Sequence, residues 1–282
     1  MSPRVVSLLP AATEIVWALG AVEWLVGVSH ECDYPPAVRE IPRVTRTSLD
    51  SGRPSGEIDA AVGSSGRAGE SLLTIDRDLI RRLAPDVVIG QAVCDVCAVG
   101  MGDLAGAIAG LDPAPATVTL HAHTLAGVWD DIRIVGAAIG LADEADELVA
   151  GLQVRLRGLM PRTNGRPRVL VLEWLDPPYV AGHWVPELVA AAGGEDVAAQ
   201  PGVRSTARPW PELRALRPDV VVVAPCGFDV PRARRELAAV RDPDALVLLA
   251  GRMGFVDGNA YTSRPGPRLV DGAGRIAALI AG

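Results

Sequence analysis

The stretch Leu83-Ala84-Pro85-Asp86-Val87-Val88 decides the fold, because it returns with small changes as Leu216-Arg217-Pro218-Asp219-Val220-Val221. In both copies a helical stretch runs up to the leucine, a Pro-Asp pair follows, and a short apolar run comes next. Proline biases the residue before it away from the helix, and β-branched residues favour a strand, so each copy predicts a helix-to-strand connection. One such connection in each half of the chain favours two similar lobes over one continuous sheet.

Strand and helix patterns alternate around both copies, as they do in parallel sheets covered by helices. In the first half we expect strands at Arg4–Leu8, Trp24–Val28, Asp86–Ile89 and Thr117–Leu120, and helices at Ala11–Leu19 and Asp76–Leu83. In the second half we expect strands at Arg168–Leu172, Asp219–Ala224 and Ala245–Leu249, and helices at Pro186–Ala192, Trp210–Leu216 and Arg268–Ile280. The stretch between Arg43 and Gly69 is rich in Gly, Ser, Arg and Thr, and it predicts a surface loop.

Two helical stretches separate the halves. Within His123–Gly140 apolar residues recur at helical spacing, and a second helix is expected at Ala142–Leu159. Either one of these helices spans the lobes as a stiff strut, or both are ordinary crossover helices. Periodicity alone does not separate these interpretations.

Composition and missing motifs narrow the function classes. With 49% hydrophobic residues and a mean hydropathy of +0.25, the chain is typical of a well-buried globular protein. Its formal net charge of −7 disfavours nucleic acid as a partner. No apolar run reaches the roughly 18 residues of a membrane span, and no secretory signal is recognisable, so we expect a cytoplasmic protein. The motifs of P-loop, dinucleotide-binding, zincin and α/β-hydrolase sites are absent.

All four cysteines follow the carboxyl end of an expected strand. Cys32 follows Trp24–Val28, Cys94 and Cys97 follow Asp86–Ile89, and Cys226 follows Asp219–Ala224. Ligands of parallel α/β sheets bind at this edge, so we expect the sulfur atoms at a shared opening, with His30 and Glu31 as nearby candidates. Three interpretations stay open: a zinc or iron–sulfur centre, plain thiols beside a ligand, and a redox dithiol at Cys94 and Cys97.

Aromatic and charged side chains gather in other loops. Trp174 and Asp176 lie in a loop after an expected strand, and Gly182-His183-Trp184 leads from there into a helix. Such residues suit a flat or apolar ligand face, or they cap the core. Tyr261 and Arg264 precede the last helix, where the arginine can meet an anion. His121 and His123 stand at a strand end, either as a metal pair or as a polar turn.

The opening stretch carries a family resemblance. Arg4-Val5-Val6-Ser7-Leu8-Leu9-Pro10-Ala11-Ala12-Thr13-Glu14-Ile15, together with Asp33-Tyr34-Pro35 and Ala192-Gly193-Gly194, resembles the cobalamin-type substrate-binding proteins of ABC importers. The resemblance implies two Rossmann-like α/β lobes joined by a long bridging helix, with the ligand in a cleft between them and an importer as partner. The chain would then divide into an N-terminal lobe at 1–123, a bridging helix at 124–140 and a C-terminal lobe at 141–282.

Further segments are similar to a subgroup that lacks an export signal, contains a Cys-x-x-Cys pair and is identified as cobalamin-binding. These segments are Cys94–Val99, Asp176–Pro178, Ala181–Glu187, Pro225–Phe228 and Ser263–Pro267. We therefore expect a binding protein, rather than an enzyme, for cobalamin or a related corrinoid or metal chelate. The expected ligand-binding residues are Tyr34, Trp174, Asp176, His183, Trp184, Tyr261 and Arg264. The alternative is a cytoplasmic protein, with an enzyme among the options, that holds zinc or an iron–sulfur cluster through Cys32, Cys94, Cys97 and Cys226.

Overall fold

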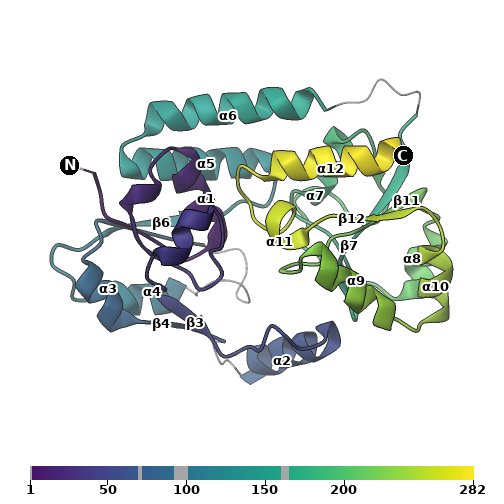
Figure 1. Ribbon diagram of the computed structural model, residues 1–282, viewed down its shortest axis with the longest axis horizontal. Coiled ribbons are helices and arrows are strands. Elements are labelled where there is room, and N and C mark those ends of the chain that lie inside the picture. Colours follow the sequence, from purple (N-terminus) through teal and green to yellow (C-terminus); the bar gives the residue numbers. More distant parts are fainter. Residues whose placement is uncertain (1, 69–71, 92–100, 160–164) are drawn as a thin grey trace. The chain divides into compact units, whose positions relative to one another are not determined.

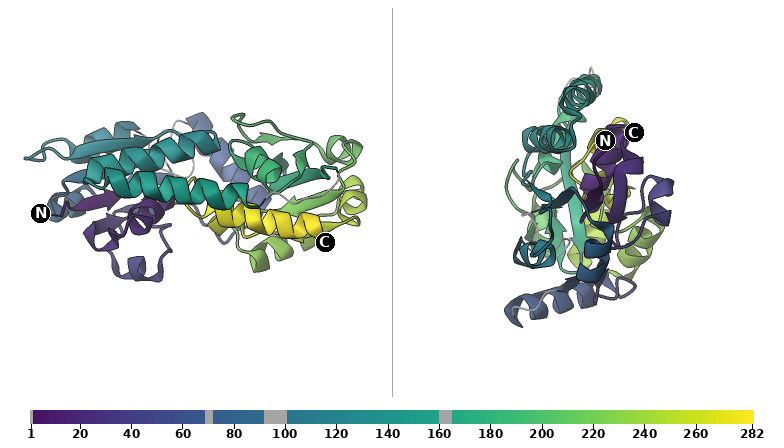
Figure 2. Two further views of the ribbon diagram at one scale, coloured as in Figure 1. Left: turned by 90° about the horizontal axis from the view of Figure 1, so that it is seen from above. Right: turned by 90° about the vertical axis from the view of Figure 1, so that its left-hand side faces the viewer.

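The computed structural model describes residues 2–68, 72–91, 101–159 and 165–282. The chain divides into two compact units. Unit 1 comprises Met1–Ser51, Ala60–Ala122 and Ala126–Gly151, and unit 2 comprises Gly52–Asp59, His123–Leu125 and Leu152–Gly282. Figure 1 colours the elements of both units along the sequence, and Figure 2 gives two further views. Each unit has its own sheet and core and is described by itself.

Unit 1 is built on a four-stranded parallel sheet in the order β2-β1-β5-β6. Its strands are β1 (Val5–Ser7), β2 (Leu25–Val28), β5 (Val87–Gln91) and β6 (Ala116–Leu120). The connecting helices include α1 (Pro10–Ala18), α3 (Arg77–Leu83) and α4 (Met101–Ile108), with short 3-10 turns at η1 (Val22–Trp24) and η2 (Pro36–Glu40). Val6 and Val88 share one buried cluster with Ile80 of α3 and Leu104 of α4. The strands are apolar because helices cover them.

Unit 2 contains a mixed sheet in the order β10-β8-β7-β11-β12, with β9 paired to β7. Its strands are β7 (Arg168–Leu175), β8 (Pro178–Val180), β9 (Glu195–Asp196), β10 (Thr206–Ala207), β11 (Val220–Val223) and β12 (Met253–Phe255). Its helices include α7 (Val185–Ala191), α8 (Trp210–Ala215), α9 (Val230–Ala239), α10 (Pro243–Leu249), α11 (Gly258–Tyr261) and α12 (Leu269–Ala281). Figure 1 shows α7 and α12 on one side of the strands and α9 and α10 on the other. The predicted fold class, two α/β lobes with parallel strands, is confirmed.

The repeated Leu-x-Pro-Asp pattern folds in the same way in both units. The Oδ2 atom of Asp86 accepts the backbone N–H of Arg4 at 2.7 Å, and Oδ2 of Asp219 accepts that of Arg168 at 2.7 Å. In return, each aspartate donates its own N–H to the carbonyl of the same arginine, at 2.8 Å and 2.7 Å. The aspartate therefore ties together the beginnings of two neighbouring strands, β1 with β5 and β7 with β11.

The two predicted helices between the halves are present as α5 (Leu125–Ile139) and α6 (Ala142–Arg157). The chain passes between the units inside α6, after Gly151, and also at the start of α5, because His123–Leu125 belongs to unit 2. The lobe boundaries at 123 and 140 stay a prediction.

Two predictions of secondary structure are wrong. The stretch between Arg43 and Gly69 is not a loop, because it holds β3 (Thr45–Thr47), which pairs with β4 (Leu73–Ile75), and helix α2 (Ser55–Ala68). The polar sequence of α2 lacks the apolar stripe by which a helix is recognised in a sequence, and side chains of unit 2 hold its first turn instead.

The second wrong prediction is the strand at Ala245–Leu249, which lies in helix α10. The Oδ1 atom of Asp242 accepts the N–H groups of Asp244 and Ala245, at 2.8 Å and 3.2 Å, and Pro243 occupies the first helical position. An aspartate cap followed by proline is a strong helix start. This local capping outweighs the strand preference of the apolar run. Among the described residues, no helix has the length and apolar character needed to cross a membrane.

Candidate ligand-binding site

Two histidine rings meet in unit 2. The Nδ1 atoms of His123 and His183 lie 3.2 Å apart, with ring centroids at 5.3 Å and ring planes 27° from parallel. The two residues are 60 positions apart in the sequence. Sequence reasoning considered His123 together with His121 and missed its partner, because nothing local connects the segment before α5 with the segment before α7.

The backbone of His183 is held in an unusual conformation. Its φ is 54°, in the left-handed region that residues other than glycine seldom adopt. The N–H of His183 donates to the carbonyl of Val203 at 2.6 Å, and its carbonyl accepts the N–H of Gly202 at 2.9 Å. The residue before His183 is Gly182. A Cβ atom at Gly182 would lie within 2.7 Å of the backbone of Arg204, so only glycine fits there. The direction of the His183 side chain is thus fixed by a close approach of two backbone segments.

Trp184 packs against the side chain of His183. Its indole is 6% exposed and stacks on the His183 ring, with centroids 5.5 Å apart. The indole Nε1–H donates to the carbonyl of Thr262 at 2.8 Å. One turn later, Oε2 of Glu187 accepts the N–H of Leu125 at 2.7 Å, which ties the segment that carries His123 to α7. Both imidazoles therefore stand on anchored backbone.

Burial lowers the pKa of His183, and the neighbouring His123 and the guanidinium of Arg204 lower it further. A lowered pKa keeps the imidazole neutral near pH 7, which is the form that binds metals. The ring is half-buried, so one side of it faces solvent.

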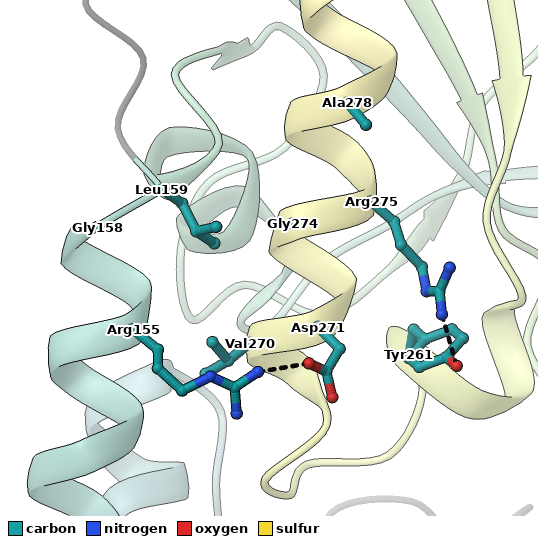
Figure 3. A pocket seen from close by; sticks show the side chains of 9 residues that line it. All are labelled: Arg155, Gly158, Leu159, Tyr261, Val270, Asp271, Gly274, Arg275 and Ala278. Carbon is teal, nitrogen blue, oxygen red and sulfur yellow. Dashed lines mark hydrogen bonds and ion pairs between the residues drawn. The ribbon is translucent and has the colours of Figure 1, made fainter.

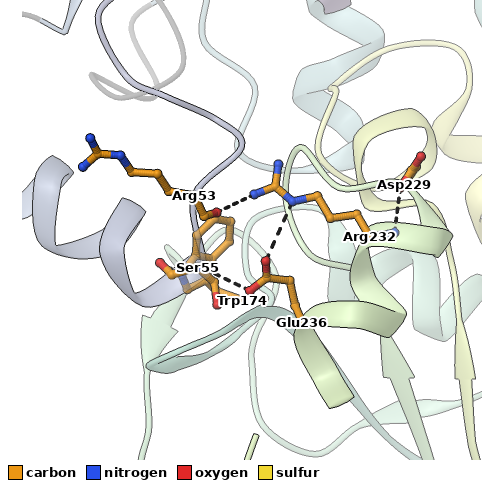
Figure 4. Close-up of polar contacts among 6 residues, drawn as sticks. All are labelled: Arg53, Ser55, Trp174, Asp229, Arg232 and Glu236. Atoms are coloured by element: carbon orange, nitrogen blue, oxygen red, sulfur yellow. Dashed lines mark hydrogen bonds and ion pairs between the residues drawn. The ribbon is translucent and has the colours of Figure 1, made fainter. Parts of the chain in front are cut away.

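Trp174 belongs to a second cluster in unit 2. Its ring packs on Phe228, with centroids 4.9 Å apart, and the guanidinium of Arg232 lies 3.7 Å above the Phe228 ring. Asp229 caps α9 by accepting the N–H of Arg232 at 2.8 Å, and Glu236 follows one turn later (Figure 4). The result is an aromatic and charged surface beside the carboxyl ends of β7 and β11.

The segment Gly52–Asp59, here named the 52–59 segment, binds to this cluster. Arg232 Nη2 donates to the carbonyl of Arg53 at 2.8 Å, Glu236 Oε2 accepts the N–H of Ser55 at 3.0 Å, and Trp174 Nε1 donates to the carbonyl of Ser55 at 3.3 Å (Figure 4). The carboxylate of Asp176 packs against Gly56, where a Cβ would collide with it. Two of the expected ligand-binding residues, Trp174 and Asp176, are therefore in contact with this segment.

The two described cysteines lie in different units and differ in burial. Cys32 is 1% exposed inside unit 1, with its Sγ 3.1 Å from Oγ1 of Thr13. Cys226 of unit 2 is half-buried, and its N–H donates to the carbonyl of Glu173 at 2.9 Å. Cys32 therefore fits a small apolar core residue better than a thiol at a rim.

The other members of the expected metal site give no centre in the part of the chain that is described. His30 Nδ1 is bonded to Thr45 Oγ1 at 2.8 Å, and Glu31 follows it in an exposed position. Cys94 and Cys97 lie outside the described residues, so the redox dithiol stays a prediction. Over residues 2–68, 72–91, 101–159 and 165–282, no group of three or more His, Cys, Asp and Glu side chains is arranged to hold a metal ion. The described part of the chain and the related proteins give the zinc or iron–sulfur alternative no support.

Three expected residues, Tyr34, Tyr261 and Arg264, have the following neighbours. Tyr34 of unit 1 meets Trp17 edge-on, with ring centroids 4.9 Å apart. Arg264 of unit 2 is largely buried and donates to Asn259 Oδ1 at 2.8 Å. Tyr261 lines a pocket between α6 and α12, where its hydroxyl accepts a hydrogen bond from Arg275 at 2.8 Å (Figure 3).

Comparison with known proteins places this chain among binding proteins. The family described as "Periplasmic binding protein" matches residues 5–239. A cobalamin-binding protein of Halobacterium salinarum is 28% identical, over 97% of this chain and 68% of its own length. An uncharacterised ABC transporter substrate-binding lipoprotein of Bacillus subtilis is 25% identical, over 57% of this chain and 42% of its own length. The solved structure of a periplasmic heme-binding protein from Roseiflexus sp. RS-1 has a TM-score of 0.70 at 25% identity, covering 99% of this chain and 98% of that one.

The prediction of a cytoplasmic protein is wrong. It relied on finding no recognisable secretory signal, whereas the matching family consists of periplasmic binding proteins and one relative is a lipoprotein. The predicted resemblance to cobalamin-type binding proteins is confirmed by the same comparisons. Since the family match covers most of the sequence and both α/β units, this chain belongs to the periplasmic binding protein family.

Proposed function

We propose that this chain binds cobalamin, or a related corrinoid or metal chelate, and delivers it to an ABC importer. The observation that carries the proposal is the match to a cobalamin-binding protein over 97% of the chain. The importer follows from the relative that is an ABC transporter substrate-binding lipoprotein. Heme is the competing ligand, because the Roseiflexus protein of similar structure is a heme-binding protein.

The chemistry of unit 2 supports a planar metal chelate as the ligand. A corrin or porphyrin ring offers an apolar face that packs on aromatic side chains, and a central metal that accepts an imidazole. Trp184 stacks on the ring of His183 at 5.5 Å between centroids and so orients the imidazole that would bind the metal. We assign the contacts of the ligand to Tyr34, Trp174, Asp176, Trp184, Tyr261 and Arg264, with His183 next to the metal. The position of the ligand in a cleft stays a prediction.

Isothermal titration calorimetry with cobalamin, followed in parallel by visible absorbance, tests the proposal. We expect a dissociation constant in the micromolar range or below, which corresponds to about 8 kcal/mol or more of binding free energy. Heme, titrated under the same conditions, decides between the two chelates. Absence of heat and of any absorbance change with both ligands at high micromolar concentration would rule the proposal out.

A further inference from the structure

The hydrogen bond between His123 and His183 leaves two different nitrogen atoms free. A neutral imidazole carries one proton, either on Nδ1 or on Nε2. Because the two Nδ1 atoms lie 3.2 Å apart, one ring donates its Nδ1–H and the other accepts it. The donor ring then has a bare Nε2 with a lone pair, and the acceptor ring has an Nε2–H. Only the donor ring can bind a metal through Nε2.

His183 is the better placed of the two rings to be that donor. Its backbone is held at φ 54° by Val203 and Gly202, and its ring stacks on the buried Trp184. His123 is exposed, and its segment is tied to unit 2 through Leu125 and Glu187. A ligand atom needs a fixed direction, whereas its partner needs only to keep the hydrogen bond.

We infer that Nε2 of His183 is the axial ligand of a chelated metal, and that His123 is a positioning residue that accepts the Nδ1–H of His183. The inference rests on the proposed function, since the chelate supplies the metal. Binding forms one bond from Nε2 to the metal and releases the water molecule that occupied the axial position. A metal-bound histidine whose second nitrogen donates to a fixed acceptor is a stronger ligand.

A planar chelate suits this arrangement better than a free metal ion does. Four ring nitrogens already surround the metal of a corrin or porphyrin, so a single axial nitrogen is all that the protein can usefully add to its coordination. A free divalent ion needs several protein ligands, and the described residues contain no group of three or more candidate side chains. When two imidazoles are hydrogen-bonded through their Nδ1 atoms, one Nε2 lone pair remains for a metal. A single nitrogen of this kind suits a planar chelate.

Two corrinoid probes test the inference on the full chain. The first, aquacobalamin, has an axial water that can be exchanged, and the second, dicyanocobinamide, has cyanide on both axial positions. We expect aquacobalamin to bind with a shift of its visible bands that marks imidazole coordination, and dicyanocobinamide to bind more weakly without such a shift. Equal binding of both probes, with no shift for either, would overturn the inference and leave the proposed function standing.

Variants separate the ligand from its positioning residue. His183→Asn preserves the backbone, because asparagine accepts positive φ, and it should lose the shift entirely. His123→Ala should keep the shift but bind aquacobalamin about 10- to 100-fold more weakly. His121→Ala, which changes an exposed histidine two positions away, is the matched control and should equal the parent protein. Affinity of His123→Ala equal to that of the control would refute the positioning role.

Chemical rescue distinguishes a metal ligand from a residue that only stabilises the structure, because added imidazole can replace the ligand but not a structural contact. His183→Gly tolerates the positive φ and leaves space for free imidazole. We expect added imidazole to restore the band shift with aquacobalamin bound to this variant. A shift retained by His183→Asn would assign coordination to another residue. Failure of the parent protein to bind either corrinoid or heme would overturn the proposed function and this inference together.

Discussion

Asp219 and Arg168 are bonded in both directions: Oδ2 of Asp219 accepts the backbone N–H of Arg168 at 2.7 Å, and the Asp219 N–H donates to the Arg168 carbonyl at 2.7 Å. Asp219→Ala removes the side-chain acceptor where β7 and β11 begin. Since the carboxylate is exposed, we expect the free energy of unfolding to fall by about 1 kcal/mol. Chemical denaturation measures this change. Asp219→Asn keeps an acceptor oxygen and should lose less; equal losses for both variants would contradict the explanation.

Gly182→Ala should damage the His183 site through the backbone. The added Cβ would press on the segment Val203–Ser205, and we expect a loss of about 1–3 kcal/mol in unfolding free energy together with weaker ligand binding. Gly151→Ala is the control, because no atom lies within 4 Å of its Cβ position in α6. That control should stabilise the protein by about 0.5–1 kcal/mol. Thermal unfolding and calorimetry on both variants decide the point, and unimpaired binding by Gly182→Ala would speak against it.

Glu236→Ala should release the 52–59 segment. The Oε2 atom of Glu236 is the acceptor for the N–H of Ser55, and its Oε1 lies 4.0 Å from Arg232 Nε. Hydrogen exchange at the Ser55 amide should become at least about 10-fold faster, as expected when a bond of about 1.4 kcal/mol is lost. Glu212→Ala changes an exposed glutamate of α8 and serves as the control. Unchanged exchange at Ser55 would show that other contacts hold the segment.

Asp196 should make stability depend on pH. Burial raises its pKa from 3.8 to about 6, although the N–H groups of Ala198 and Ala199 bond to its Oδ1. The folded state thus holds this proton more tightly than the unfolded state, so stability falls as pH rises from about 4 to above 6. A rise of this size corresponds to about 3 kcal/mol.

Asp196→Asn tests that dependence, because it removes the titrating group. Relative to the parent protein, the variant should gain about 2.5 kcal/mol of unfolding free energy between pH 4 and pH 7.5. Denaturation at the two pH values measures the gain. Parallel pH profiles for the parent protein and Asp196→Asn would refute the raised pKa.

Local sequence patterns predicted most of the fold. The two Pro-Asp connections, the apolar strands and the periodic helices α5 and α6 were found because each carries its signal within a few neighbouring residues. Prediction failed where a distant contact or a cap decides the structure. Helix α2 is too polar to be recognised, since its first turn is held by Glu236 and Trp174, about 120 to 180 positions away. The residues of α10 were predicted as a strand because the N-terminal cap provided by Asp242 was not considered.

The candidate site was less predictable than the fold. The position near a strand end drew attention to His183 and Trp184, and the same rule also selected Cys32, which is buried inside unit 1. Strand ends indicate where a loop begins and not the direction in which a side chain leaves it. The pairing of His123 with His183 accompanies the hydrogen bond from the Leu125 N–H to Glu187 within unit 2, for which the sequence contains no local signal.

The order of segments in unit 2 determines whether the chain can be divided into fragments that each contain a complete unit. Its three stretches, Gly52–Asp59, His123–Leu125 and Leu152–Gly282, are separated along the chain by long parts of unit 1. A fragment that starts at Leu152 would leave Glu236 without the Ser55 amide and Glu187 without the Leu125 amide. No single cut therefore yields two complete halves, and a nascent chain has to be extended to Glu236 in α9 before the earliest of these pieces can form its hydrogen bonds with unit 2.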